Sequence, residues 1–184
     1  MKYFKTVFIF FIVCFFCCGA GLEQFVIKPE VAAMQYNNKG INYLEDGHYL
    51  SAISAFKIAL GLNPESSSSA PIYNNLGRAY LKTGEPQMAQ ECFEAALHFA
   101  PMGFKYYQNL ILAYEAQNLL QSAVINNSFK VEKGMEPIIY GLAFIKLGNY
   151  RRGKNLLQNF VKNEQNLIIT KAINEYLKQV TDDL

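Results

Sequence analysis

The sequence predicts an all-α protein, a solenoid of about four stacked helical hairpins followed by one C-terminal capping helix. Two stretches of the chain have the same glycine, aromatic, alanine and proline residues in the same order, 37 residues apart, which is a repeat of roughly 34 residues plus a slightly extended serine-rich loop. Apolar residues make up 51% of the sequence and charged residues 17%, which is enough apolar surface for a continuous core. The last stretch, residues 167–181, alternates apolar and polar residues with the period of an amphipathic helix.

Before the first hairpin, residues 1–20 have the three-part layout of a secretory signal. Two lysines, Lys2 and Lys5, precede an uncharged and mostly apolar run, which ends in the small residues Gly19 and Ala20. Three fates remain open for this leader: cleavage after Ala20, retention as a membrane anchor, or acylation of Cys18, because the segment resembles a loose bacterial lipoprotein signal. All three predict an exported chain that is periplasmic, membrane-anchored or secreted. Residues 21–32 form a short lead-in.

Charge excludes one class of partner. The formal net charge is +2, and the two excess positive charges are Lys2 and Lys5 of the leader, so the remainder is neutral overall. A nucleic-acid-binding protein needs a basic field that displaces counterions from phosphates. We therefore expect no nucleic-acid partner.

The first two hairpins are predicted at residues 33–66 and 70–103. In the first helix of each, a glycine, a tyrosine and a turn glycine fall in register; in the second, an alanine and a phenylalanine do so. The matching residues are Gly40 and Gly77, Tyr43 and Tyr80, Gly47 and Gly84, Ala52 and Ala89, Phe56 and Phe93, Pro64 and Pro101. A glycine inside a helix costs about 1 kcal/mol relative to alanine, so its presence predicts a close helix-to-helix approach. The aromatic side chains then fill the wedge between the two helices.

The third and fourth hairpins, predicted at residues 104–133 and 134–166, follow the pattern less closely. In the third, Asn118 replaces the turn glycine and Asn127 replaces the second-helix aromatic. In the fourth, Gly153 takes the alanine position. The capping helix is expected at 167–181, with the following residues toward the core: Ile168, Ala172, Ile173, Tyr176, Leu177 and Val180.

Taken together, Tyr73, Leu76, Gly77, Tyr80, Ala89, Phe93 and Pro101 resemble the tetratricopeptide repeat (TPR), with tyrosine where tryptophan is usual. The resemblance implies a right-handed solenoid whose first helices line a concave groove that binds an extended peptide or a partner helix. The groove positions are Asn37, Asn38, Ile41, Asn74, Asn75, Arg78, Lys82, Lys105, Gln108, Asn109, Leu112, Ile138, Ile139, Leu142 and Lys146. Side-chain amides there can pair with a peptide backbone, unless they simply populate the surface, and Arg78 and Lys105 can meet a carboxylate.

Some members of this family grip a C-terminal carboxylate with lysines, asparagines and an arginine. Asn75 and Lys105 match two of those positions, whereas Asn37, Ile41 and Asn109 depart from the pattern. The resemblance therefore predicts a groove, but not that particular clamp.

The function expected from export and repeats together is a non-catalytic adaptor that binds a protein or peptide. The alternative is a structural assembly factor of a secretion or pilus-type envelope complex, with Val124, Ile125 and Phe129 as an exposed contact surface. Catalysis, a metal and a cofactor are not expected, because His48 and His98 lack partners at a defined spacing. Cys92, alone in the body of the chain, fits inert packing.

One basic cluster remains, formed by Arg151, Arg152 and Lys154 at the start of the second helix of the fourth hairpin. It is either a solvated patch or a contact for anionic lipid, the latter only if the leader stays in a membrane.

Overall fold

The computed structural model describes residues 28–62 and 68–182, and every regular element in these ranges is a helix, as predicted. The helices are α2 (Pro29–Glu45), α3 (Tyr49–Leu62), α4 (Ser69–Thr83), α5 (Pro86–Phe99), α6 (Phe104–Ala116), α7 (Leu120–Ile125), α8 (Glu136–Lys146), α9 (Tyr150–Asn163) and α10 (Ile168–Asp182). The predictions on the leader, on Cys18 and on Pro64 lie outside the described residues. Within the described ranges, no helix has both the length and the apolar composition that crossing a bilayer requires.

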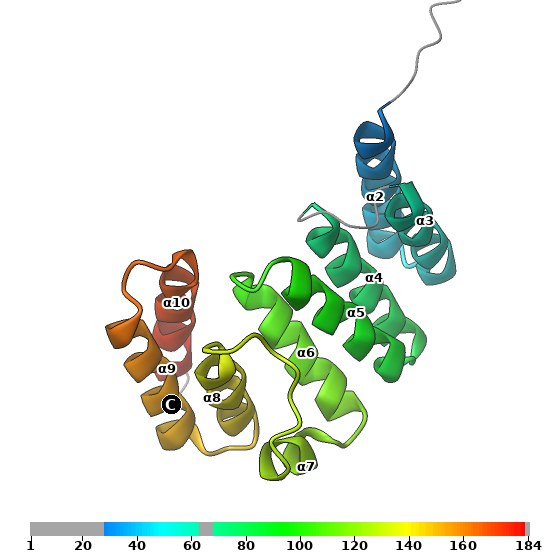
Figure 1. Ribbon diagram of the computed structural model, residues 1–184. Helices are drawn as coiled ribbons and strands as arrows, with labels where there is room; N and C mark the ends of the chain where they lie inside the picture. Colours follow the sequence, from blue (N-terminus) through cyan, green and yellow to red (C-terminus); the bar gives the residue numbers. More distant parts are fainter. Residues whose placement is uncertain (1–27, 63–67, 183–184) are drawn as a thin grey trace, which may run out of the picture.

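Consecutive helices pack as hairpins, and the hairpins stack into a curved row (Figure 1). The first helices touch one another in succession: α2 contacts α4, α4 contacts α6, and α6 contacts α8. In the described part of the chain the second helices α3, α5, α7 and α9 make no such contacts with each other. The first helices therefore line the inner side of the curve.

The chain reverses between paired helices through the same backbone conformation in all four hairpins. Gly47, Gly84, Asn118 and Gly148 all have positive φ, at 79°, 81°, 58° and 83°. After each of them, the next backbone N–H donates to a carbonyl five residues back, which satisfies an orphan group of the helix end. Asn118 fills the glycine position because asparagine tolerates the left-handed region better than other side chains do.

Close helix approach at the internal glycines is as predicted. A Cβ built on Gly40 would lie 2.5 Å from the ring of Phe56, and one on Gly77 would lie 2.6 Å from the ring of Phe93. In the fourth hairpin, a Cβ on Gly141 would lie 2.7 Å from the side chain of Leu157. Each glycine of a first helix thus makes room for a large side chain of the second.

The third hairpin breaks this pairing. Buried Ile111 stands where the other hairpins have the helical glycine, and Asn127 stands where they have the large partner. Asn127 has a φ of +51°, and the N–H of Ser128 donates to the carbonyl of Ala123, so α7 ends at Ile125. With polar Asn127 in place of the large apolar partner, a longer helix would gain less from packing.

The expected exposure of Phe129 is wrong. Its ring is half-buried and packs edge-on against Tyr114 and Tyr140, with centroid separations of 4.9 and 5.2 Å. It fills part of the space that α7 leaves open, where edge-to-face aromatic pairs are favourable. Of the three expected contact residues, Ile125 remains well exposed, at 69%.

The capping helix α10 contacts α9 and also reaches α6, where Tyr176 meets the ring of Phe104 at 5.5 Å. Ile173 and Leu177 are buried as predicted, but Ile168 is 85% exposed. The inward position in the first turn belongs instead to Ile169. The helix begins at Ile168, so this side chain lies before the apolar stripe, and the prediction for it was wrong.

Burial also predicts how stability depends on pH. It raises the pKa of Cys92 to about 12 and that of Tyr114 to about 12, and it raises the pKa of Tyr107 further. The unfolded chain ionises these groups near pH 8.5 and 10. These groups therefore leave the free energy of unfolding unchanged below about pH 8.5, and they lower it as the pH rises toward 12. Urea titrations at pH 8, 9.5 and 11 should show a falling midpoint, and a midpoint that stays constant would contradict this.

Candidate functional site

Polar side chains on the inner helices α2, α4 and α6 form a ladder of hydrogen bonds between successive hairpins. The Nδ2 atom of Asn75 donates to Oδ1 of Asn37 at 3.2 Å, and Nδ2 of Asn109 donates to Oδ1 of Asn74 at 2.6 Å. Arg78 donates from Nη1 to Oδ1 of Asn75 at 3.3 Å. The ladder joins residues 38 and 35 positions apart, so it fixes the register between neighbouring first helices.

The predicted groove residues divide into three groups by exposure. Asn38, Lys82, Lys105, Leu112 and Lys146 are exposed, and Asn37, Ile41, Arg78 and Gln108 are half-buried. Asn74, Asn75, Asn109, Ile138, Ile139 and Leu142 are buried. Asn74 and Asn109 hydrogen-bond to each other, and Asn75 hydrogen-bonds to Asn37 and Arg78. Each of these three buried asparagines still has a second donor or acceptor. Much of the amide content expected to face a ligand thus holds the helices together.

The exposed part of the inner surface is basic around α4 and the start of α6. In the ranges that the structure describes, no carboxylate lies within 4.0 Å of the side-chain nitrogens of Arg78, Lys82 or Lys105. Lys146, in contrast, forms an ion pair of 3.0 Å with Glu115. Arg78 is oriented by Asn75, so its guanidinium is positioned in advance for an anionic group.

The expected apolar end of the groove is absent. Ile138 and Ile139 are 0% exposed and belong to the core, so the prediction that they face a ligand was wrong. Tyr176 of α10 instead joins Leu112 and Leu142 in the lining of a small cavity of about 230 Å³ between α6, α8 and α10. The capping helix therefore shortens the open inner surface to the first three hairpins.

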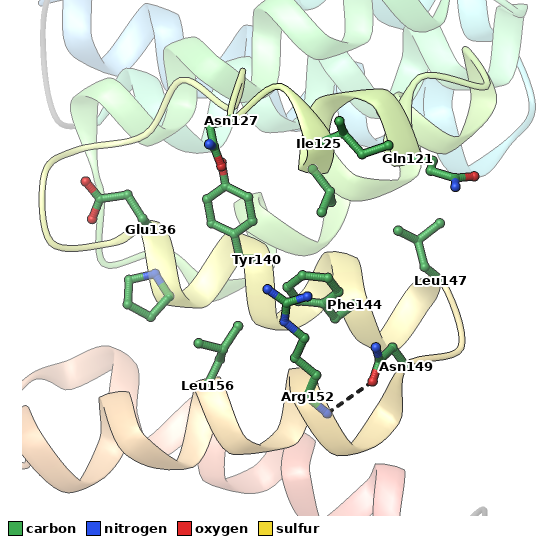
Figure 2. Close-up of a pocket in the computed structure, with 12 residues that line it drawn as sticks. Gln121, Ile125, Asn127, Glu136, Tyr140, Phe144, Leu147, Asn149, Arg152 and Leu156 are labelled. Atoms are coloured by element: carbon green, nitrogen blue, oxygen red, sulfur yellow. Dashed lines mark hydrogen bonds between the residues drawn. The ribbon is translucent and has the colours of Figure 1, made fainter.

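A second hollow lies between α7, α8 and α9, and the sequence reasoning did not predict it (Figure 2). Its volume is about 770 Å³. The guanidinium of Arg152 lies 4.0 Å from the centroid of the Phe144 ring, and the hydroxyl of Tyr140 donates to Oδ1 of Asn127 at 3.0 Å. The sequence contained one signal of this hollow, because Asn127 stands where the other second helices have a large side chain. A second helix that lacks this side chain leaves part of the adjacent helix uncovered.

In the described residues, no three His, Cys, Asp or Glu side chains are placed to share a metal ion. Cys92 is buried, and its raised pKa of about 12 keeps it protonated at neutral pH. The rings of His48 and His98 lie against Tyr43 and Phe99, with centroid separations of 6.4 and 5.3 Å.

Comparison with known proteins adds a family match for part of the chain. The tetratricopeptide repeat family matches residues 70–102, which contain α4 and α5. No curated protein matches the sequence significantly.

Solved structures show the same kind of fold at low sequence identity. The structure described as the functional characterisation of Pseudomonas aeruginosa pilF has a TM-score of 0.50 and 17% identity, and the match covers 82% of this chain and 71% of that one. The Arabidopsis OM64 TPR domain has a TM-score of 0.45 and 15% identity, and the match covers 82% of this chain and 98% of that one. The first TPR of Spaghetti (RPAP3), bound to the HSP90 peptide SRMEEVD, has a TM-score of 0.47 and 15% identity, and the match covers 83% of this chain and 95% of that one. The family match in the second hairpin and the shared all-helical hairpin fold together support a tetratricopeptide repeat protein.

Proposed function

We propose that this protein is a non-catalytic interaction scaffold that binds an acidic segment of a partner protein along the inner face of its first three hairpins. The observation that supports this most is the basic surface of Arg78, Lys82 and Lys105, which has no carboxylate partner within the described residues. A partner with acidic side chains or a terminal carboxylate would complement it, and electrostatic complementarity selects partners and speeds association.

The asparagine ladder supports the proposal in a second way. Asn37, which bonds to Asn75, is half-buried, and its neighbour in the chain, Asn38, is exposed, so a ligand can reach both side chains. A side-chain amide can donate to a peptide carbonyl and accept from a peptide N–H. An extended segment can thus be bound through its backbone while Arg78 and Lys105 select for acidic side chains.

A photo-crosslinking experiment in cells tests this assignment. A photoreactive residue at Asn38 should give a crosslinked partner that mass spectrometry identifies, and the yield should fall about tenfold when Arg78→Glu and Lys105→Glu are added. The same photoreactive residue at Leu50, which is exposed on α3, should not capture that partner. The proposal fails if the Asn38 adduct survives both charge reversals.

The proposed place of action is outside the cytosol, with the leader cleaved after Ala20, acylated at Cys18 or retained as an anchor. Its basis is the signal-like layout of residues 1–20. Mass spectrometry of the protein from its own cells distinguishes a start at Gly21, a lipid-modified Cys18 and an intact Met1. An intact, unmodified chain found only in the cytosolic fraction would refute export.

The role of assembly factor is a second candidate, because Ile125 is 69% exposed at the edge of the 770 Å³ hollow. Exposed apolar surface beside a hollow is typical of an interaction site.

A further inference from the structure

We propose that the hollow between α7, α8 and α9 binds an acidic amphipathic helix of a partner protein, which occupies the place where the second helix of the third hairpin ends early. This surface lies outside the inner face and does not depend on the groove proposed above. It gives the candidate assembly role a binding site and a partner chemistry.

The first argument is the missing length of helix. The other second helices, α3, α5 and α9, are each 14 residues long, whereas α7 has 6. The difference is about two helical turns. In the first two hairpins the second helix packs along the next first helix, but α7 makes only a short contact with α8. Within the described residues, one flank of α8 is therefore left without its usual helical neighbour.

The second argument is the apolar lining of the hollow. Side chains of three helices converge on it, including Ile125 from α7, Phe144 and Tyr140 from α8, and Leu156 from α9. Ile125 is 69% exposed and Leu147, at the end of α8, is 41% exposed. An amphipathic helix inserts apolar side chains spaced three or four residues apart into such a groove.

The third argument is charge. Arg151 and Arg152 are exposed at the start of α9, and in the described residues no carboxylate lies within 4.0 Å of their guanidinium nitrogens. A smaller hollow of about 340 Å³, lined by Arg151, Asn155 and Asn159, continues from the first along α9. An acidic residue on the flank of the bound helix would face these two arginines.

The one acidic group in the lining, Glu136, lies at the other end, at the start of α8. Its Oε2 atom accepts a hydrogen bond from the N–H of Gly134 at 2.6 Å. The hollow is thus positive near Arg152 and negative near Glu136, which favours an occupant with its acidic residues gathered at one end.

A lipid surface is the competing source of negative charge, and two observations disfavour it. Lipid-binding surfaces use clusters of roughly 4–8 Lys or Arg, whereas this cluster consists of Arg151, Arg152 and the half-buried Lys154. In addition, the guanidinium of Arg152 lies over the Phe144 ring inside a concave site, which a flat layer of headgroups cannot fill.

The test uses two synthetic peptides of about 16 residues, long enough to form helix. Both have one stripe of leucines with alanine elsewhere; one has a terminal flank of glutamates and the other has lysines in their place. Fluorescence anisotropy measures their binding to the full-length protein purified from cells that express it. We expect the acidic peptide to bind at least tenfold more tightly than the basic one at physiological salt.

Charge reversal provides the decisive variant. Arg151→Glu with Arg152→Glu should weaken the acidic peptide at least tenfold and make the basic peptide the tighter ligand. Ile125→Gln should weaken both peptides about fivefold through lost apolar contact, whereas Leu50→Gln, a change at an exposed leucine of α3, should alter neither. Arg78→Glu with Lys105→Glu, which tests the inner groove, should also leave both affinities unchanged.

Other outcomes overturn the proposal. Equal affinity for the two peptides, or no response to the Arg151 and Arg152 changes, excludes the charged recognition proposed here. If phosphatidylglycerol vesicles bind the protein through these arginines while neither peptide binds, the cluster is a lipid contact. If sedimentation instead shows a dimer that Ile125→Gln dissociates, the occupant is a second copy of this chain.

Discussion

Phe93→Ala should lower the free energy of unfolding by about 3–5 kcal/mol, the largest effect that we expect for a single substitution. The Phe93 side chain is 0% exposed and packs against Gly77, where only the absence of a Cβ leaves room for its ring. Truncation removes the transfer free energy of the ring and leaves a cavity that two rigid helices cannot close. Urea denaturation followed by circular dichroism measures the difference.

The matching change on the opposite helix distinguishes packing from simple loss of apolar area. Gly77→Ala alone should cost about 1–3 kcal/mol, because the added Cβ would lie 2.6 Å from a ring carbon of Phe93. In the Phe93→Ala background the same change should stabilise the protein by up to about 1 kcal/mol, since alanine favours the helix. Additive effects of the two substitutions would show that the glycine does not serve the ring.

This pair also shows why the first two hairpins were predictable from the sequence. Gly77 and Phe93 belong to a pattern in which each residue has a structural role within its own hairpin. It forms a turn, permits a close helix approach or fills the space between the two helices. Asn118 extends the same logic, because its left-handed conformation serves the same reversal as the turn glycines do. Where a structural cause lies within one hairpin, the sequence order alone indicates it.

The candidate site was less predictable because contacts between neighbouring hairpins determine which side chains are exposed there. Asn74, Asn75 and Asn109 bond between neighbouring first helices, because whether an asparagine faces a ligand or a neighbour depends on the distance between helices. Ile138 and Ile139 are buried in the complete fold, and periodicity within α8 cannot show that. The hollow beside α7 depends on a helix that ends early, so it is detected as a departure from the pattern.

Gly153→Ala should destabilise the fourth hairpin by about 2–3 kcal/mol. A Cβ at this position would lie 2.5 Å from the carbonyl oxygen of Gly141 and 2.9 Å from the backbone nitrogen of Ile145. Both obstacles are backbone atoms, so no side chain can rotate away and α9 must shift from α8. The equivalent positions of the first two hairpins hold Ala52 and Ala89, so those hairpins accommodate a Cβ for which α8 and α9 leave no room.

Gly61→Ala is the control, because Gly61 lies in α3 and a Cβ there would meet nothing within 4 Å. It should stabilise the protein by about 0.5 kcal/mol, through the reduced entropy of the unfolded chain. Because α8 and α9 form two walls of the hollow, Gly153→Ala should also weaken the acidic peptide proposed to bind there, at temperatures where the variant is still folded. If Gly153→Ala proves as stable as Gly61→Ala, α8 and α9 do not meet at these glycines, and the hollow between α7, α8 and α9 does not have the shape on which the docking proposal depends.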